Sequence, residues 1–179
     1  MIRNAFILIT LLTCSAAAVA EPSKDKGFYL AGAYGRSIYD EGGSFGNFGD
    51  DEDNSYHIAV GYKIFRYLSV EARYANFGSF NFLFENFDVD ATSLHVVGIA
   101  PFGQSGWEFF GQLGIGTVNR DVRGFGGLDD SAAAGGIGFR WYPKPNFALG
   151  IQTDVYVWDD NNDWESSVGA TQLSLQVIF

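Results

Sequence analysis

Residues 167–179 read SVGATQLSLQVIF, and their polarity alternates from one residue to the next. One face of an extended chain would carry every second residue: Thr171, Leu173, Leu175, Val177 and Phe179. Glutamine and serine fill the positions between them, with Ile178 as the exception. A period of two residues is typical of a β-strand with one apolar and one polar face. The stretch therefore predicts a strand that separates two different environments.

The same alternation recurs along the chain, and each recurrence has the length that a tilted strand needs to cross a bilayer. No run of eighteen apolar residues follows residue 21, which excludes a membrane-spanning helix there. We therefore predict an all-β chain of eight strands, at residues 28–39, 55–65, 68–77, 90–102, 107–118, 131–142, 147–158 and 167–179.

The connections between these strands alternate in length. Residues 66–67, 103–106 and 143–146 are short turns. The intervening loops are longer, at 40–54, 78–89, 119–130 and 159–166. An even-stranded meander puts both ends of the chain on the side of the short turns, as in outer-membrane barrels. The pattern predicts an eight-stranded antiparallel up-and-down transmembrane β-barrel that occupies residues 21–179.

The first twenty residues have the pattern of an export signal. Arg3 supplies a positive charge, an apolar run follows, and residues 18–20 read AVA, a typical cleavage site. Cleavage after Ala20 would remove Cys14, the one cysteine of the chain. We therefore expect a signal peptide at 1–20 and an exported protein without disulfides.

Charge narrows the class of partner. The chain carries 11 Lys and Arg against 21 Asp and Glu, a net charge of −10. Nucleic acid is disfavoured, because duplex binding needs clustered cations. The polar faces of the predicted strands carry charges among 23 glycines, which suits a narrow interior in which charges must pair. The predicted interior network comprises Lys63, Glu71, Arg73, Glu108, Arg140 and Asp154.

Periodicity alone does not say which face points outward. A soluble barrel that carries an apolar ligand also has eight strands, but its apolar face points inward. Aromatic residues lie near the strand ends of the apolar face, as in the two girdles of a barrel in lipid. They include Phe28, Tyr34, Tyr62, Tyr74, Trp107, Trp141 and Phe147. Together with the loop lengths they favour the membrane barrel over a lipocalin-like periplasmic carrier.

Several segments resemble a known family. Residues 27–35 (GFYLAGAYG) resemble the first strand of the eight-stranded outer-membrane barrels typified by the membrane domain of outer membrane protein A, OmpA. Residues 61–63 (GYK) and 67–74 (YLSVEARY) are similar to its first hairpin. The resemblance implies that Glu71 is an interior carboxylate with Arg73, Arg140 or Lys63 as its partner. It also implies that the terminal Phe179 is the signal for the barrel-assembly machinery. Because the sequence stops there, we do not expect the cell-wall-binding domain of the full-length type.

The longer loops carry most of the acidic residues and an aromatic cluster. Residues 50–53 read DDED, and such loops either bind divalent cations, shared with lipopolysaccharide, or are simply solvated. The loop 78–89 contains Phe80, Phe82, Phe84 and Phe87. These rings either form an exposed patch for a partner or belong to extensions of the flanking strands.

We predict no catalysis and no cofactor. The mature chain has two histidines, His57 and His95, and the sequence shows no serine near either of the kind a lipid-A deacylase would have. The expected function is structural, in envelope integrity, or interactive, through the surface loops. Expected partners are outer-membrane lipid, lipopolysaccharide and the assembly machinery.

Overall fold

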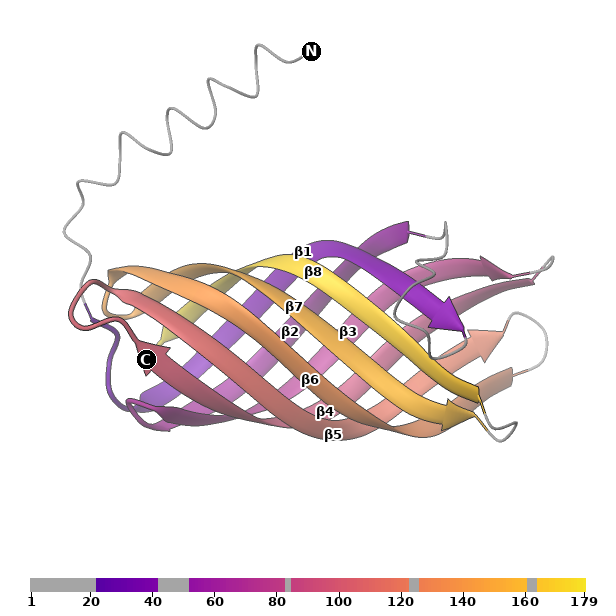
Figure 1. The fold of residues 1–179 in the computed structure, drawn as a ribbon, viewed down its shortest axis with the longest axis horizontal. Coiled ribbons are helices and arrows are strands. Elements are labelled where there is room, and N and C mark those ends of the chain that lie inside the picture. The colour runs from indigo at the N-terminus through magenta and orange to yellow at the C-terminus, as the bar shows by residue number, and fades with distance from the viewer. Residues whose placement is uncertain (1–21, 42–51, 83–84, 123–125, 161–163) are drawn as a thin grey trace, which may run out of the picture.

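The chain closes into a single barrel (Figure 1). The computed structural model describes residues 22–41, 52–82, 85–122, 126–160 and 164–179. Each strand pairs antiparallel with the next, and β1 pairs with β8, so no strand edge is left open. The strands are β1 (Gly27–Glu41), β2 (Glu52–Phe65), β3 (Leu68–Phe82), β4 (Glu85–Pro101), β5 (Trp107–Val122), β6 (Gly126–Lys144), β7 (Phe147–Asp160) and β8 (Trp164–Ile178). The predicted all-β, eight-stranded antiparallel up-and-down barrel is confirmed.

Strand closure satisfies the backbone inside lipid. Every main-chain donor and acceptor at membrane depth needs a partner in the protein, and a closed barrel provides one for each. Among the described residues, none forms a helix long and apolar enough to cross a membrane. The chain begins β1 and ends β8 at the end of the barrel that carries the short turns (Figure 1). This end is the periplasmic one, because outer-membrane barrels have short periplasmic turns.

Several strands are longer than the sequence predicted. β3 and β4 continue through most of the predicted loop 78–89, and Phe80 pairs with Phe87 in their ladder. β5 and β6 likewise extend into the predicted loop 119–130. The correction has a simple cause: main-chain hydrogen bonds continue a hairpin beyond the bilayer, where side chains no longer need to alternate. The Asn, Asp and Gly residues of these segments are there because the segments contact solvent. They do not mark the end of strand pairing.

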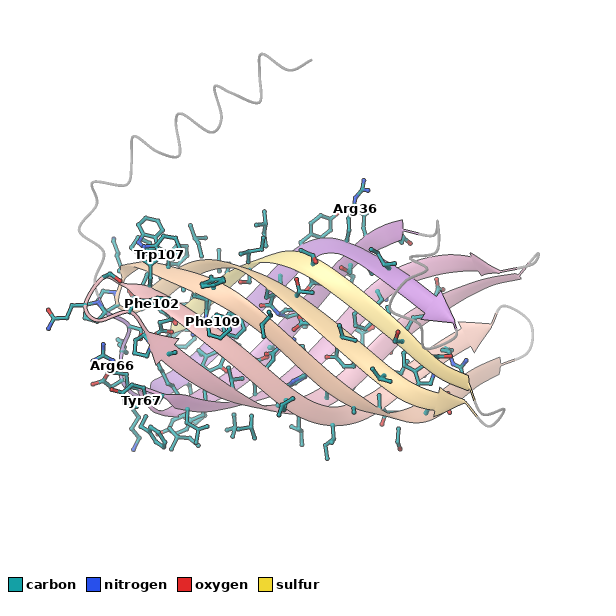
Figure 2. The ribbon with its side chains drawn as sticks, viewed as in Figure 1. Arg36, Arg66, Tyr67, Phe102, Trp107 and Phe109 are labelled. Carbon is teal, nitrogen blue, oxygen red and sulfur yellow. The ribbon has the colours of Figure 1, made fainter. Side chains whose placement is uncertain are left out.

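The apolar face points outward. Leu94, Leu113, Ile115 and Leu173 are among the most exposed large side chains, and Leu113 is 75% exposed. At the periplasmic end the outward side chains are aromatic, as Figure 2 shows for Tyr67, Phe102 and Trp107. The rings of Trp107 and Trp141 stack there with centroids 6.1 Å apart. A soluble carrier would have its apolar face inside, so that alternative is wrong.

The predicted aromatic girdle at the extracellular end covers one side of the barrel. Outward tyrosines lie on the first three strands: Tyr34 on β1, Tyr56 on β2 and Tyr74 on β3. On the next three strands the ladder continues from Tyr74 to small hydroxyl residues, namely Thr92, Thr117 and Ser131. The membrane-facing surface therefore differs in chemistry from one side of the barrel to the other.

The interior is layered. Buried apolar side chains near the extracellular end form one cluster, which includes Phe77, Val89, Tyr156 and Trp158. Near the periplasmic end, Ile178 packs with Tyr29 and Tyr142, and Val97 and Ile99 pack with Phe110. The cluster of Ile178 with Tyr29 and Tyr142 explains why Ile178 breaks the alternation of the last strand. Polar and charged side chains fill the barrel between and beside them.

A charge on the outward face tests the orientation. We expect Leu113→Arg to lower the free energy of unfolding from vesicles by roughly 2–4 kcal/mol, because a cation at the bilayer midplane loses its hydration. Ile38→Arg is the matched control, since Ile38 lies two residues beyond the outward Arg36 near the strand end and a charge there costs about 0–1 kcal/mol. Urea titration of the barrel in vesicles measures both. Equal effects at the two positions would contradict the assignment of the lipid-facing belt.

Candidate functional site: the charged network of the barrel interior

The six charged residues predicted for the interior all lie inside the barrel. None is more than 6% exposed. They come from five different strands: Lys63 from β2, Glu71 and Arg73 from β3, Glu108 from β5, Arg140 from β6 and Asp154 from β7. Each occupies an inward position of its strand because its neighbours in sequence face lipid. Three cations and three carboxylates therefore share a space shielded from water.

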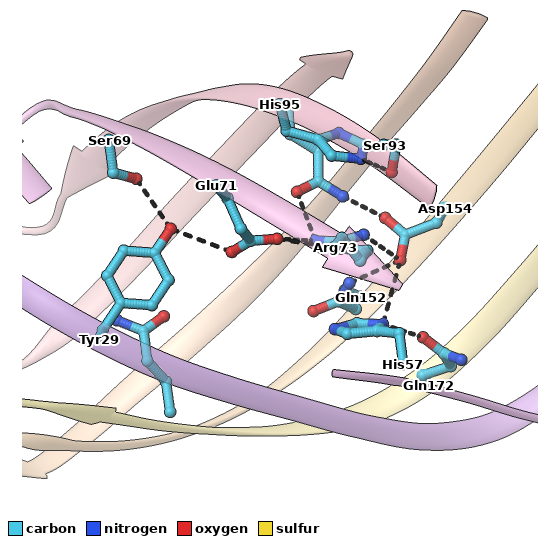
Figure 3. A network of polar contacts seen from close by, with 12 residues as sticks. Tyr29, His57, Ser69, Glu71, Arg73, Ser93, His95, Gln152, Asp154 and Gln172 are labelled. Carbon is cyan, nitrogen blue, oxygen red and sulfur yellow. Dashed lines mark hydrogen bonds and ion pairs between the residues drawn. The ribbon is translucent and has the colours of Figure 1, made fainter. Parts of the chain in front are cut away.

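Arg73 is the centre of the network (Figure 3). Its Nη2 lies 2.6 Å from Oε1 of Glu71, and its Nε donates to the same oxygen at 2.9 Å. Its Nη1 lies 3.1 Å from Oδ2 of Asp154. Nη2 also donates to Oε1 of Gln112 at 2.9 Å. One guanidinium therefore holds two carboxylates, which offsets the cost of removing all three charges from water.

Neutral side chains supply further hydrogen bonds to the carboxylates of Glu71 and Asp154. The hydroxyl of Tyr29 donates to Oε2 of Glu71 at 3.0 Å. Asp154 accepts from the side-chain amides of Gln112 and Gln152, the latter at 2.6 Å. Nδ1 of His57 lies 2.8 Å from Oε1 of Gln172 and 4.0 Å from Asp154. Most of these contacts join residues of non-adjacent strands.

A second ion pair lies at the periplasmic mouth. Nζ of Lys63 lies 3.2 Å from Oε1 of Glu108, and it also donates to Oγ of Ser23 at 2.6 Å. The Ser23 hydroxyl in turn donates to Glu108. The segment before β1 is fixed in this place by a hydrogen bond from the backbone nitrogen of Lys24 to the carbonyl oxygen of Pro145, at 3.0 Å. Sequence reasoning missed Ser23, because it precedes the first strand and belongs to no alternating pattern.

Arg140 does not pair with Glu71. Its Nη1 donates to Oε1 of Gln176, and its guanidinium lies 4.1 Å from the centroid of the Phe110 ring. Lys63 is bound to Glu108 instead. Of the three partners that the family resemblance offered for Glu71, the structure places Arg73 beside it.

Glycines make room for the large interior side chains. A Cβ at Gly61 would lie 2.1 Å from Cζ of Tyr29, and one at Gly136 would collide with Asp154. Gly114 leaves the same kind of space for the ring of His95. At these positions glycine is therefore a packing requirement of the narrow interior.

A serine does lie beside His95, and the prediction that none is near was wrong. Ser93 lies two residues before His95 and so faces the same side of β4. Its Oγ is 2.7 Å from Nε2 of His95 and 2.9 Å from the hydroxyl of Tyr156. Ser93 and His95 are each 3% exposed. In the described part of the chain, no group of three or more His, Cys, Asp or Glu residues could hold a metal ion.

The interior leaves little free space around the network. A gap lined by residues that include Arg73, Gln112 and Arg140 offers about 10 Å³. This is about the space that one water molecule requires. The charged groups are therefore packed against one another rather than arranged around an aqueous channel at this level.

The other predicted site residues lie at the two ends of the barrel. Phe179 is 66% exposed at the periplasmic end, and its backbone nitrogen donates to the carbonyl oxygen of Phe28 at 2.8 Å. Phe84 and the side chains of Phe80, Phe82 and Phe87 lie outside the described residues. So does the DDED run, apart from Asp53 and the backbone of Glu52.

A family model for the outer membrane protein beta-barrel domain matches residues 6–179. The chain belongs to this family. As an outer membrane barrel it resides in the outer membrane, with the lipid-facing belt and the charged interior described above. A search of curated protein sequences finds no match.

Solved structures of outer membrane barrels have the same fold. Neisserial surface protein A (NspA) superposes with a TM-score of 0.74 at 14% identity, over 88% of this chain and 100% of that one. OprG of Pseudomonas aeruginosa gives a TM-score of 0.58 at 9% identity, over 88% and 99% of the two chains. Ail, the attachment invasion locus protein of Yersinia pestis, gives 0.57 at 16%, over 86% and 99%, in a complex with the heparin analogue sucrose octasulfate. Identities this low establish the common fold alone.

Removal of the central cation tests the network. We expect Arg73→Met to lower the free energy of unfolding of this outer membrane barrel by about 3–5 kcal/mol, because Glu71 and Asp154 would remain buried without their cation. Lys26→Met, at an exposed position just before β1, is the control and should change it by no more than about 0.5 kcal/mol. Urea unfolding in vesicles measures both. A loss at Arg73 as small as the control's would show that the ion pairs do not stabilise the barrel.

Proposed function

We propose that this outer membrane barrel is a sealed, non-catalytic component that supports the barrier of the outer membrane. The observation that carries the proposal is the closed interior. Arg73, Glu71 and Asp154 cross its middle, and Lys63, Glu108 and Ser23 cross its periplasmic mouth. A barrel filled in this way offers lipid a rigid outer surface rather than a path for solutes.

The cross-barrel contacts support this proposal. Lys63–Glu108 joins β2 to β5, Arg73–Asp154 joins β3 to β7, and the contact between His57 and Gln172 joins β2 to β8. Such bonds hold non-adjacent strands at a fixed separation, so the wall is supported from inside. A barrel wall held in this way suits a structural role in the envelope. Because side chains fill the interior, any ion conductance should be small.

A deletion strain tests the proposal. Cells that lack the protein should become more sensitive to detergents and to antibiotics that the outer membrane normally excludes. The wild-type gene should restore resistance, and so should a variant altered in the surface loops, because the proposed role depends on the braced barrel. Survival counts on detergent plates measure the effect. An unchanged barrier in the deletion strain would refute the structural role.

A second candidate is binding of a surface partner through the β3–β4 hairpin. The pairing of Phe80 with Phe87 extends this hairpin at the extracellular end, with aromatic residues on both strands. Apolar clusters that are exposed usually mark interaction sites, so aromatic residues at this end of the barrel suit a protein partner. A polyanion is a poor partner, because the segment 40–54 contains six carboxylates.

A double substitution at the hairpin tests the second candidate. Phe82→Asp with Phe84→Asp should abolish binding to host cells or to a protein partner, while the barrel still shifts on unboiled detergent gels as a folded one does. Cell-binding counts for the wild type and the double variant give the comparison. Unchanged binding would eliminate the adhesive role.

We further propose that Phe179 presents its ring to the barrel-assembly machinery. The exposed ring at the periplasmic end supports this role, because the alternating apolar face of β8 leads directly to it. The ring is accessible from the side on which an exported chain arrives.

A further inference from the structure

The β3–β4 hairpin leaves the barrel at an irregular step in β3. The register shifts between Asn76 and Gly78, so that Phe77 and Gly78 stand together opposite Val89. Two residues of one strand against one of the other form a β-bulge. Gly78 has a φ of +88°, a conformation that favours glycine. Past the bulge β3 still pairs with β4, whereas its pairing with β2 has ended at Tyr56 and Asn76.

The bulge reverses the two faces of β3. Before it, the odd-numbered residues point inward, as the buried Ala75 and Phe77 show. After it, the odd-numbered Ser79 is exposed, and its hydroxyl donates to Asp88. An extra residue shifts the period of two by one position, which moves every later side chain to the other face. The bulge therefore determines which residues of the hairpin lie on the face that continues the barrel interior.

Asp53 of β2 binds the bulge through its side chain. In the register of the β2–β3 ladder, Asp53 would stand opposite Ser79. Instead of a main-chain carbonyl, its Oδ2 accepts from the backbone nitrogen of Ser79, at 2.6 Å. Its Oδ1 accepts from the backbone nitrogen of Asn54, also at 2.6 Å. A Cβ at Gly78 would lie 2.5 Å from Oδ2 of Asp53, so this close approach requires glycine.

Two other strands contact the same short segment of β3. The hydroxyl of Ser37 on β1, a residue with no exposed surface, donates to the carbonyl oxygen of Phe77. The same hydroxyl lies 3.3 Å from the carbonyl oxygen of Asp53. The ring of Phe77 packs inside the barrel against Tyr156 of β7, with centroids 5.2 Å apart. The bulge is therefore held by contacts from β1, β2 and β7.

We propose that Asp53 is the positioning residue of the β3–β4 hairpin. Its carboxylate keeps Phe77 and Gly78 in the bulge, and the bulge puts positions 80 and 82 on the face over the extracellular mouth. Without the extra residue, the period of two would put the phenylalanines at these positions on the outer face.

The inference rests on the proposed binding role of the hairpin, and it narrows the kind of partner. Aromatic residues on the face over the mouth are reached by a protein that approaches from the medium, along the barrel axis. Aromatic residues on the outer face would instead be reached by a neighbouring protein in the membrane. A charge-assisted hydrogen bond suits the positioning role, because it is stronger than a bond between neutral groups.

The test follows the position of the hairpin in the folded barrel. Cys14 lies in the predicted signal peptide, so the mature chain carries no cysteine and two introduced ones can hold spin labels. One label replaces Val157 on β7, and the other is placed at position 80 or at position 81. Pulsed electron paramagnetic resonance gives the distance distribution between the labels in phospholipid vesicles. Position 80 should lie closer to Val157 than position 81, because its side chain would point across the mouth.

Variants of Asp53 test its role. Asp53→Ala should broaden both distance distributions and remove the difference between positions 80 and 81. It should also speed hydrogen exchange of the Ser79 amide about tenfold, which corresponds to roughly 1.4 kcal/mol. Asp53→Asn should restore most of the protection, because an amide oxygen also accepts hydrogen bonds. The matched control is Asp129→Ala, which removes an exposed carboxylate of β6 and should behave as wild type.

A change at the glycine gives an independent check. Gly78→Ala should broaden the distributions as Asp53→Ala does, although the carboxylate is kept, because the added Cβ would collide with Asp53. The midpoint of urea unfolding in vesicles should stay at the wild-type value for Asp53→Ala, since the barrel wall below the hairpin is unchanged.

Several outcomes would overturn the inference. They are a position 80 no closer to Val157 than position 81, unchanged exchange of the Ser79 amide in Asp53→Ala, or an equal change in Asp129→Ala. A lower urea midpoint in Asp53→Ala would also overturn it, because Asp53 would then stabilise the whole barrel. These results are distinct from failure of the binding role, which the cell-binding counts for Phe82→Asp with Phe84→Asp report.

Discussion

The narrowness of an eight-stranded barrel is the constraint on which the rest of this structure depends. Closure of eight strands leaves an interior that side chains nearly fill. Charged groups placed there lose their water and are tolerated only with partners. Arg73 therefore holds both Glu71 and Asp154, and glycine stands wherever a large side chain needs the space opposite it. The high glycine content, the paired charges and the absence of room near Arg73 for more than about one water molecule share this cause.

Because of the same constraint, any function other than structural support must lie on the outer surface of the barrel. With the interior braced, the surfaces that remain are the lipid-facing wall and the extracellular ends of the strands. The wall is not uniform: tyrosines on β1–β3 give way to threonine, serine and small residues on β4–β6.

Much of the fold could be predicted from alternation, but the boundaries of the strands could not. The period of two and the alternating loop lengths identified all eight strands and their order. The predicted β3–β4 hairpin was too short. Beyond the bilayer the two strands remain hydrogen-bonded, but their side chains no longer alternate in polarity. The interior charges were predictable as a set, since each lies on the polar face of its strand. Their pairing was not, because partners on different strands meet only in the closed barrel. Ser23 was missed because it precedes the first strand, whereas the Ser93–His95 contact follows from the period of two and was overlooked.

The sequence by itself determined that the chain is an all-β barrel with two chemically different faces, because a period of two is a local property of an extended chain. It also determined which charges share the polar face. Only the tertiary structure decided that the polar face is the interior, that Arg73 rather than Arg140 or Lys63 binds Glu71, and that the outward residues change from tyrosine to threonine and serine around the barrel. These facts depend on strand register and closure, which bring together residues that no local pattern connects.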